Sequence, residues 1–430
     1  MLLQTDDQTI EDLRLFARRE QPGIYDIYNN TFTRGAEFLL EEMFRNPLSD
    51  RNAIRERSTI ISSFAKRRTL FPFRPALLDN LEKYLSGSGQ HRDRQRPALG
   101  EKEIAAGVAA AIELLHAVRD FVEKGEALNI DGLHTRRKAI LEILQDLALQ
   151  PVFNENPRAK LSYAAVTAFD ILIRVRERKK IIDVLQFIYL IDVYISVATI
   201  ATRHGFIFPT VHTGRGPMIH VEGVFHPELR NPVANDLSMD RNQSIIFLTG
   251  ANMAGKSTFL RSLSIAVYIA HMGFPVAARA MEFSVLDGLF TTINLPDNLG
   301  IGASHFYAEV LRVKKISTAL GAGKSLFIVF DELFRGTNVK DAHEGTVTMT
   351  QAFARKDNSL FIISSHIVEA ATELKELSNV GFWNLPTQMQ GHTPAYTYRL
   401  REGVTDDRHG MIIIRNEGVL DILATGKKNG

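Results

Sequence analysis

The sequence predicts an α/β domain built on a mainly parallel sheet with flanking helices, preceded by an all-α domain. Apolar residues recur at helical spacing from Thr9 to about His204, whereas short β-rich runs alternate with helical ones after Gly205. Between two of the later runs lies a glycine-rich loop, Gly250-Ala-Asn-Met-Ala-Gly-Lys-Ser257. We therefore expect two domains, covering residues 1–204 and 205–430.

The composition is that of a globular protein large enough for two domains. The 430 residues are 45% hydrophobic, and 51 basic side chains nearly balance 49 acidic ones. With a net charge of only +2, no overall field favours nucleic acid or a membrane surface, so any DNA contact must use local patches. The absence of cysteine excludes disulfides, thiolate metal sites and cysteine nucleophiles, and it fits a reducing compartment.

The first half reads as helices separated by clusters of turn-forming residues. Breaks are expected at Asn46-Pro47, from Phe71 to Pro75, and in the stretches 86–100 and 150–157. Apolar residues at helical spacing mark successive segments between these breaks: Phe38, Leu39 and Met43; Ile54, Ile61 and Phe64; Ile140, Ile143, Leu144 and Leu147.

The most apolar window, from Ile181 to Ala201, is expected to be a buried core helix and not a membrane span. It contains Asp183, Gln186 and Asp192, which would be costly at the centre of a bilayer. The N-terminus is polar and acidic, unlike a secretory signal peptide. We therefore expect no membrane association and a cytoplasmic location.

The strands expected in the second half are Ile245 to Leu248, Leu326 to Phe330, Leu360 to Ser364 and Gly410 to Ile414. The glycine-rich loop follows the first, Asp331-Glu332 follows the second, and His366 comes directly after the third. Since the carboxyl ends of parallel strands share one edge of a sheet, these three features are expected to meet there.

The glycine-rich loop is typical of a phosphate-binding loop that leads from a strand into a helix. Its backbone N–H groups and the helix dipole favour phosphate oxygens, Lys256 would reach the β- and γ-phosphates, and Ser257 would ligate Mg²⁺. The expected nucleotide-binding residues are Gly250, Ala251, Asn252, Met253, Ala254, Gly255, Lys256, Ser257 and Thr258.

A second segment, Gly321-Ala-Gly-Lys-Ser325, looks similar but is interpreted as a surface turn. It has Thr318 where the first glycine of the pattern belongs, and it precedes a strand instead of following one.

The acid pair after the second strand suits Mg²⁺-dependent phosphoryl transfer. Asp331 would hold the metal through its water shell, and Glu332 would polarise the attacking water. A strand ending in two solvated acids is the simpler alternative, which the presence of Lys256 makes less favoured. His366 would sense the γ-phosphate, or it is a strand-end histidine with a local partner.

These motifs resemble the DNA mismatch-repair ATPase MutS family. The loop Thr249–Thr258, with its distinctive Asn252 and Met253, looks like that family's phosphate loop. The run Asp331-Glu-Leu-Phe-Arg-Gly-Thr-Asn338 with Asp341 is similar to its second motif, and Ser365-His366 matches its switch histidine. Segments His226-Pro227 and Asn235-Asp236, and several helical segments of the first half, resemble the family as well.

The resemblance implies an ABC-type ATPase domain preceded by a core or lever domain, with Mg²⁺ and ATP as ligands. It implies a homodimer formed through the ATPase domain, with Ser304 donated in trans to the γ-phosphate. The family usually has Gly-Arg-Ser-Thr-Phe there, where this chain has Gly302-Ala-Ser-His-Phe306, so a helix cap is a rival role for Ser304. Val233 and Tyr398 would flank the adenine.

DNA as a partner is implied mainly by the resemblance, as a sequence-nonspecific ligand. Basic runs at Arg92, Arg94 and Arg96, and from Arg174 to Lys180, could neutralise phosphates, but a solvated helix face explains each better. Phe-x-Glu occurs at Phe121, Phe153 and Phe330, close to the chance expectation, and one occurrence is the acid pair itself. We therefore infer no mismatch-reading wedge.

The sequence thus predicts a MutS-like ATPase that gates DNA binding by its nucleotide state. One alternative is a nucleotide-gated scaffold or clamp that hydrolyses little ATP. A transporter-type ABC ATPase is disfavoured because the Leu-Ser-Gly-Gly-Gln signature is absent, and a small-metabolite kinase because no Arg-rich lid follows the loop.

Overall fold

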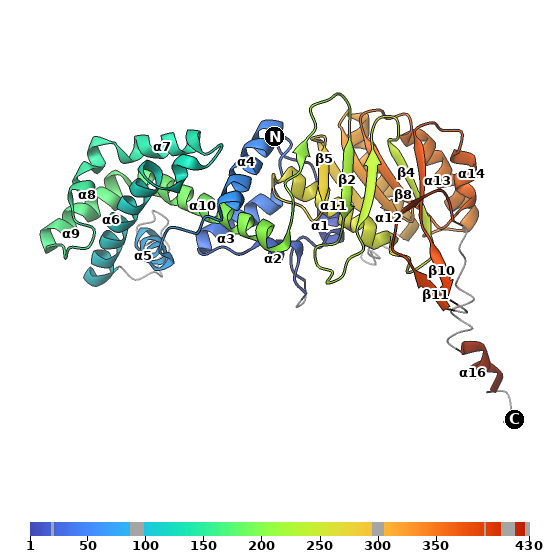
Figure 1. The fold of residues 1–430 in the computed structure, drawn as a ribbon, viewed down its shortest axis with the longest axis horizontal. Helices are drawn as coiled ribbons and strands as arrows, with labels where there is room; N and C mark the ends of the chain where they lie inside the picture. Colours follow the sequence, from blue (N-terminus) through green and yellow to red (C-terminus); the bar gives the residue numbers. More distant parts are fainter. Residues whose placement is uncertain (19–20, 87–98, 295–304, 391–392, 406–417, 426–430) are drawn as a thin grey trace. The chain divides into compact units, whose positions relative to one another are not determined.

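The computed structural model describes residues 1–18, 21–86, 99–294, 305–390, 393–405 and 418–425 (Figure 1). Contacts divide the chain into two compact units. The helical unit comprises Ile27–Arg45 and Glu56–His204, and the α/β unit comprises Met1–Asp26, Asn46–Arg55 and Gly205–Gly430.

The boundary after His204 lies where it was expected, but residues 1–26 and 46–55 were wrongly placed in the first domain. They fold with the α/β unit because the edge of its sheet offers them backbone partners. Gln4 forms a parallel bridge with Gly288, and the Leu3 N–H donates to the Pro47 carbonyl at 2.9 Å. Such pairing satisfies edge groups that would otherwise be exposed.

Every regular element assigned within the described residues of the helical unit is a helix. After α2 (Ile24–Tyr28) these are α3 (Arg34–Arg45), α4 (Arg51–Arg67), α5 (Pro75–Ser86), α6 (Glu101–Glu123), α7 (His134–Leu144), α8 (Gln150–Asn154), α9 (Tyr163–Asp170) and α10 (Arg178–His204). There are also two short 3-10 helices, η1 (Glu126–Asn129) and η2 (Leu147–Leu149), and a π-helical segment, η3 (Ile171–Arg176).

The long helix α10 is largely buried within the helical unit. It is long and apolar enough to cross a membrane, yet 83% of its most apolar window is buried inside the protein. Its buried Asp192 carboxylate accepts hydrogen bonds from the Thr33 N–H at 2.9 Å and the Thr33 hydroxyl at 2.8 Å. A buried acid that is satisfied in this way suits a protein core.

The α/β unit contains a six-stranded sheet in the order β12-β9-β4-β8-β7-β6. The pairs β9–β4, β4–β8, β8–β7 and β7–β6 are parallel, and β12 runs antiparallel at one edge. Its strands are β4 (Ile245–Gly250), β6 (Gly288–Thr292), β7 (Leu326–Asp331), β8 (Leu360–Ser364), β9 (Val380–Leu385) and β12 (Arg401–Glu402). The mainly parallel sheet is as expected, while residues 410–414, expected as a strand, lie outside the described residues.

A smaller sheet and a hairpin complete the strands of this unit. The smaller sheet has the order β1-β5-β2-β3, from β1 (Thr210–Val211), β5 (Ala280–Phe283), β2 (Ile219–Val224) and β3 (Asn235–Met239). The hairpin pairs β10 (Thr387–Gln390) with β11 (Thr393–Tyr396). Two helices lie at the ends of the chain, α1 (Asp7–Asp12) and α16 (Val419–Thr425).

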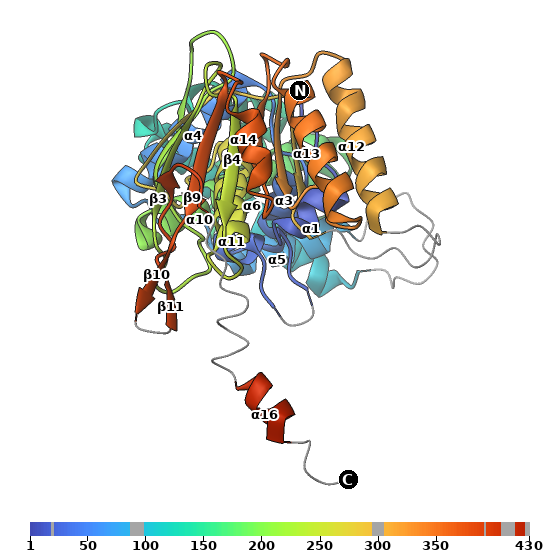
Figure 2. The ribbon, with the colours of Figure 1, turned by 90° about the vertical axis from the view of Figure 1, so that its right-hand side faces the viewer.

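Helices cover both faces of the large sheet. On one face lie α12 (His305–Gly321), α13 (Val339–Phe353) and α14 (Glu369–Leu374), which Figure 2 shows side by side. On the other face, α11 (Lys256–His271) contacts β4, β6 and β7, and it also contacts β2 of the smaller sheet. Because α11 lies between two sheets, its position is tightly constrained, and it begins at the glycine-rich loop.

Candidate nucleotide-binding site

The glycine-rich loop joins the end of β4 to the start of α11. Gly255 precedes the helix with φ of +97°, and Met253 has φ of +67°. A Cβ added at Gly255 would lie 2.9 Å from the Tyr398 ring, so the close approach of that ring also requires glycine here. The loop backbone is thus left-handed at Gly255, where the sequence supplies glycine, and at Met253, where it does not, and the loop leads into the N-terminus of α11.

Lys256 is buried, at 5% exposure, and its ammonium group lies within the loop. The Nζ atom donates to the Gly250 carbonyl at 2.9 Å and to the Ala251 carbonyl at 3.2 Å. Burial lowers the pKa of Lys256, while the charges of Asp331 and Glu332 oppose that change. Phosphate oxygens bound in the loop would compete with these two carbonyl groups for the N–H donors of Lys256.

Ser257 and Asp331 come together from two neighbouring elements. The Ser257 hydroxyl donates to Asp331 Oδ2 at 2.5 Å. Asp331 Oδ1 is buried and has no hydrogen-bond partner within the described part of the chain. A hydroxyl and a carboxylate with an unsatisfied oxygen are the hard oxygen donors that Mg²⁺ prefers, so these residues fit a magnesium site.

Glu332, His366 and Lys256 form a second cluster beside Ser257 and Asp331. His366 Nε2 lies 2.8 Å from Glu332 Oε1 and 3.2 Å from Lys256 Nζ. In a hydrogen bond, this nitrogen either donates its N–H to Glu332 or accepts an N–H from Lys256, depending on the tautomer. The hydrogen bond with His366 lowers the pKa of Glu332, so the carboxylate remains ionised at neutral pH.

The backbone aligns the three strand ends that supply these groups. The Glu332 N–H donates to the Ser364 carbonyl at 3.0 Å, and the Ser365 N–H donates to the Leu248 carbonyl at 3.0 Å. Glu332 itself has φ of +61°, a left-handed conformation that a non-glycine residue adopts uncommonly. Sheet pairing therefore continues to the carboxyl-terminal edge of the strands and holds Glu332 in a strained backbone conformation there.

A cavity of about 290 Å³ opens beside the loop and contains both residues expected to flank the adenine. Val233 and Tyr398 are partly exposed, at 36% and 45%. The mixed apolar and polar lining suits a nucleoside. The lining residues are Val224, His226, Leu229, Asn231, Pro232, Val233, Asn235, Gly255, Thr258, Phe259, Ser262 and Tyr398.

Asn235 is a residue of this cavity to which the sequence analysis assigned no role. Its amide donates to the Tyr398 carbonyl at 3.0 Å, and its Oδ1 accepts from the Leu400 N–H at 2.6 Å. Asn235 therefore ties the start of β3 to the segment that carries Tyr398. The Asn235-Asp236 pair was noted in the sequence, but the partner of Asn235, Tyr398, lies more than 160 residues further along the chain.

The remaining sequence predictions have mixed outcomes. Asn252, Met253 and Thr258 lie on the exposed side of the loop, and Ala251 and Ala254 are buried. Ser304 lies outside the described residues. The segment from Gly321 to Ser325 is the turn between α12 and β7, where Lys324 donates to Gln4 Oε1 at 2.6 Å.

The basic run that enters α10 contains cations already paired inside the helical unit. Arg174 binds Asp170 at 2.5 Å, and Lys180 binds Asp146 at 2.7 Å and Glu177 at 2.6 Å. Such pairing favours a structural role over a phosphate-binding surface. The other run, at Arg92, Arg94 and Arg96, lies outside the described residues.

The loop, its lysine, the acid after β7 and the parallel sheet define a P-loop nucleotide-binding domain. Within that class, residues 246–427 match the family model described as MutS domain V. Over these residues the chain is therefore similar to the ATPase domain of the MutS family.

Several curated proteins named DNA mismatch repair protein MutS are similar to the chain. The protein from Persephonella marina is 29% identical over 58% of this chain and 29% of its own length. That from Nitratidesulfovibrio vulgaris (strain DP4) is 26% identical over 81% of this chain and 40% of its own length. That from Lawsonia intracellularis is 30% identical over 56% and 28%. The chain thus spans less than half the length of these relatives.

Proposed function

We propose that the protein binds ATP with Mg²⁺, hydrolyses it to ADP and phosphate, and gates DNA binding by its nucleotide state as a homodimer. The observation that carries this proposal is the meeting of Lys256, Asp331, Glu332 and His366 at one sheet edge. The match of this region to MutS domain V supports the ATPase activity, and the names of the relatives support DNA as the partner.

In this proposal the protein's own groups position the substrate and the water. The loop N–H groups and Lys256 hold the phosphates, and Val233 and Tyr398 flank the base. Ser257 and Asp331 hold Mg²⁺, which when bound neutralises charge on the phosphates. Glu332 accepts a hydrogen bond from the attacking water, and His366 donates its Nε2 proton to hold that carboxylate in place.

The ATPase unit would act as a dimer in which Ser304 completes the partner's site, and the helices preceding it would be the family's core or lever domain. A cytoplasmic location follows from the proposed DNA partner. The changed sequence around Ser304 favours the second candidate, a nucleotide-gated scaffold or clamp with little hydrolysis and no intrinsic mismatch recognition.

Steady-state hydrolysis of ATP tests the proposal, using the wild-type protein, Lys256→Ala, Glu332→Gln and Lys324→Ala. Lys256→Ala and Glu332→Gln should each lower turnover on the order of 100-fold or more, because they remove charge stabilisation and the water-orienting base. Lys324→Ala is the matched control, since it changes the lysine of the similar segment that binds Gln4. Equal turnover in the wild type and Lys256→Ala would disprove the site assignment.

The same assay with DNA separates the two candidates. Reactions contain no DNA, matched duplex, mismatched duplex or a four-way junction. Stimulation by the junction, with both duplexes equivalent, supports a structure-sensing clamp. If hydrolysis depends on Lys256 but no DNA changes its rate, DNA is removed from the proposal. If Glu332→Gln leaves the turnover unchanged, the scaffold with little hydrolysis is favoured.

A further inference from the structure

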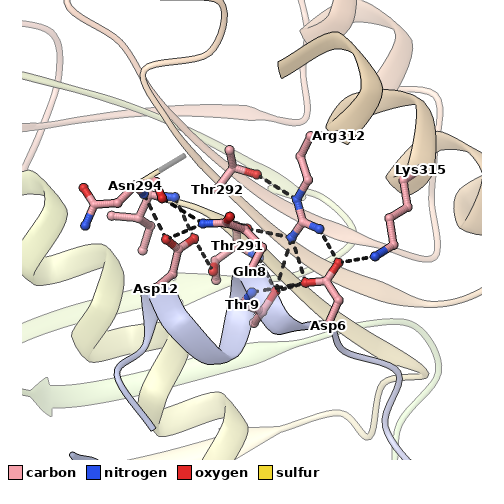
Figure 3. Close-up of polar contacts among 10 residues, drawn as sticks. Asp6, Gln8, Thr9, Asp12, Thr291, Thr292, Asn294, Arg312 and Lys315 are labelled. Carbon is pink, nitrogen blue, oxygen red and sulfur yellow. Dashed lines mark hydrogen bonds and ion pairs between the residues drawn. The ribbon is translucent and has the colours of Figure 1, made fainter. Parts of the chain in front are cut away.

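The N-terminal segment, defined as residues 1–15, makes polar contacts with β6, with α12 and with α11, the helix that follows the glycine-rich loop. Figure 3 shows side chains of this segment, of the end of β6 and of α12 in one cluster. The sequence analysis placed this segment in the first domain, whereas the structure groups it with the α/β unit.

The first contact is a buried ion pair between the segment and α12. Arg312 pairs with Asp6, and its side chain is 7% exposed. Its guanidinium also donates to the Thr291 carbonyl at 2.8 Å and to the Thr9 hydroxyl at 3.3 Å. Lys315, one turn further along α12, donates to Asp6 at 2.6 Å. Because a guanidinium has fixed donor directions, these acceptors hold α12 in one orientation.

The second contact fixes the chain that leaves β6. The Asp12 carboxylate, which is buried, accepts from the Thr291 hydroxyl at 2.8 Å, the Ile293 N–H at 2.8 Å and the Asn294 N–H at 2.9 Å. The Asp12 carbonyl accepts from Arg261 Nε of α11 at 3.1 Å. The segment therefore joins β6, α12 and the phosphate-loop helix.

A third set of contacts links α12 to the loop that carries Glu332. Glu309 lies three residues before Arg312 on α12, and it is buried. It accepts from the Gly336 N–H at 3.3 Å. The rings of Phe306 and Phe334 pack edge to face with centroids 5.8 Å apart. Phe334, like Glu332, has a positive φ, so this loop is a strained segment held by its neighbours.

We infer that Asp6 and Arg312 are positioning residues for the ATPase centre. They hold α12, and α12 holds the loop from Glu332 to Gly336 through Glu309 and Phe306. The N-terminal segment would then set how well Glu332 is aligned with its water, while the phosphate loop binds nucleotide independently. This inference depends on the proposed ATPase function for its kinetic effect, although the structural link can be measured without turnover.

The test compares the wild-type protein with Asp6→Asn and with the conservative Asp6→Glu. For Asp6→Asn we expect kcat to fall about 5- to 10-fold, with the KM and the Kd for ATP changed less than twofold, because the phosphate loop is untouched. Asp6→Glu should recover part of kcat. The milder Lys315→Ala, which removes an exposed cation, serves if Asp6→Asn does not fold.

Hydrogen exchange of the peptide covering residues 332–338 gives a readout that does not need hydrolysis. Exchange should quicken at least threefold in Asp6→Asn, because α12 is then held less firmly and Glu309, the acceptor of the Gly336 N–H, moves with it. Asp357→Asn, which breaks the exposed pair with Arg241, is the control and should leave both readouts unchanged.

The outcomes separate this inference from the proposed function. Absence of Lys256-dependent hydrolysis in the wild type removes the ATPase proposal, and the exchange result then decides the link alone. Normal kcat together with unchanged exchange in Asp6→Asn overturns the inference while leaving the ATPase intact. A lower thermal midpoint with both readouts normal also overturns it, because the contact is then only a stabilising one.

Discussion

Asp6 and Asp12 lie at the two ends of one short helix, yet their environments shift the pKa values in opposite directions. Burial would raise the pKa of Asp6, but the hydrogen bonds and charges of Arg312 and Lys315 outweigh it and lower the pKa to about 2. Asp12 has mainly N–H and hydroxyl donors, and burial raises its pKa. The difference arises because cationic side chains bind the carboxylate of Asp6, whereas neutral donors bind the carboxylate of Asp12.

These shifts predict the sign of a pH effect on stability. The contribution of Asp6 is fully present above its unfolded pKa, near 3.8, and is lost as the pH falls toward 2. Asp6→Asn should therefore lower the free energy of unfolding by about 2 kcal/mol at pH 6 and by much less at pH 2.5. Asp12 acts oppositely, since its contribution is lost as the pH rises through its raised pKa.

Fluorescence of Trp383 during urea unfolding checks this prediction. It is the single tryptophan of the chain and lies on β9, so it reports on the α/β unit. Asp357→Asn provides the comparison, because its partner is exposed and the pair contributes little. The assignment of a lowered pKa to Asp6 would be contradicted if the free energies of unfolding of the wild type and Asp6→Asn differed by the same amount at pH 6 and at pH 2.5.

Some residues of the candidate site could be predicted from the sequence, and others could not. Lys256, Ser257, Asp331 and Glu332 were predictable because phosphate and Mg²⁺ chemistry restricts residue type and spacing within a short stretch. The ligand roles themselves stay predictions. The shared nitrogen of His366 was not predictable, since its distances to Glu332 and Lys256 depend on three strands in register.

At the scale of elements, Asn235 joins the smaller sheet to the segment that carries Tyr398. It is 8% exposed, and its amide satisfies backbone groups of Tyr398 and Leu400. Removing it leaves those groups without their partner, at a stability cost of about 1–3 kcal/mol. The position of the Tyr398 ring beside Gly255 depends on this connection.

Asn235→Ala should therefore weaken ATP binding about 3- to 10-fold while leaving kcat at saturating ATP close to the wild-type value. Titration calorimetry with ATP measures the change, and exposed Asn242→Ala, in the turn after β3, is the matched control. Wild-type affinity in Asn235→Ala would mean that the cavity containing Val233 and Tyr398 does not hold the base.

Three strands of the large sheet, β4, β7 and β8, were predictable as elements because they are buried on both faces, whereas β6 and β9 were not predicted. The runs in β4, β7 and β8 are almost entirely apolar, as expected for strands covered by helices on each side. The edge strand β12 has only two residues and both are exposed, so no apolar pattern marks it. Its place in the sheet comes from pairing with β9.

At the scale of the whole molecule, the proposed function requires two copies of the chain. If Ser304 completes the partner's site, ATP should raise the mass from monomer to dimer, most clearly in Glu332→Gln, which retains nucleotide. Ser304→Ala in that background should weaken ATP-dependent dimerisation at least 10-fold. Light-scattering mass with ATP, with ADP and without nucleotide tests this. If the mass is the same with and without nucleotide in both Glu332→Gln and the double variant, Ser304 does not act in the partner's site.

The sequence by itself determined the class of the second half and predicted which of its residues bind phosphate. These depend on local spacing, on apolar runs and on residue chemistry within short stretches. Tertiary structure alone decided that residues 1–26 and 46–55 fold with the α/β unit, that Arg312 pairs with Asp6, and that Asn235 holds the Tyr398 segment. The physical reason is that each of these contacts joins positions distant in the chain, which no local pattern encodes.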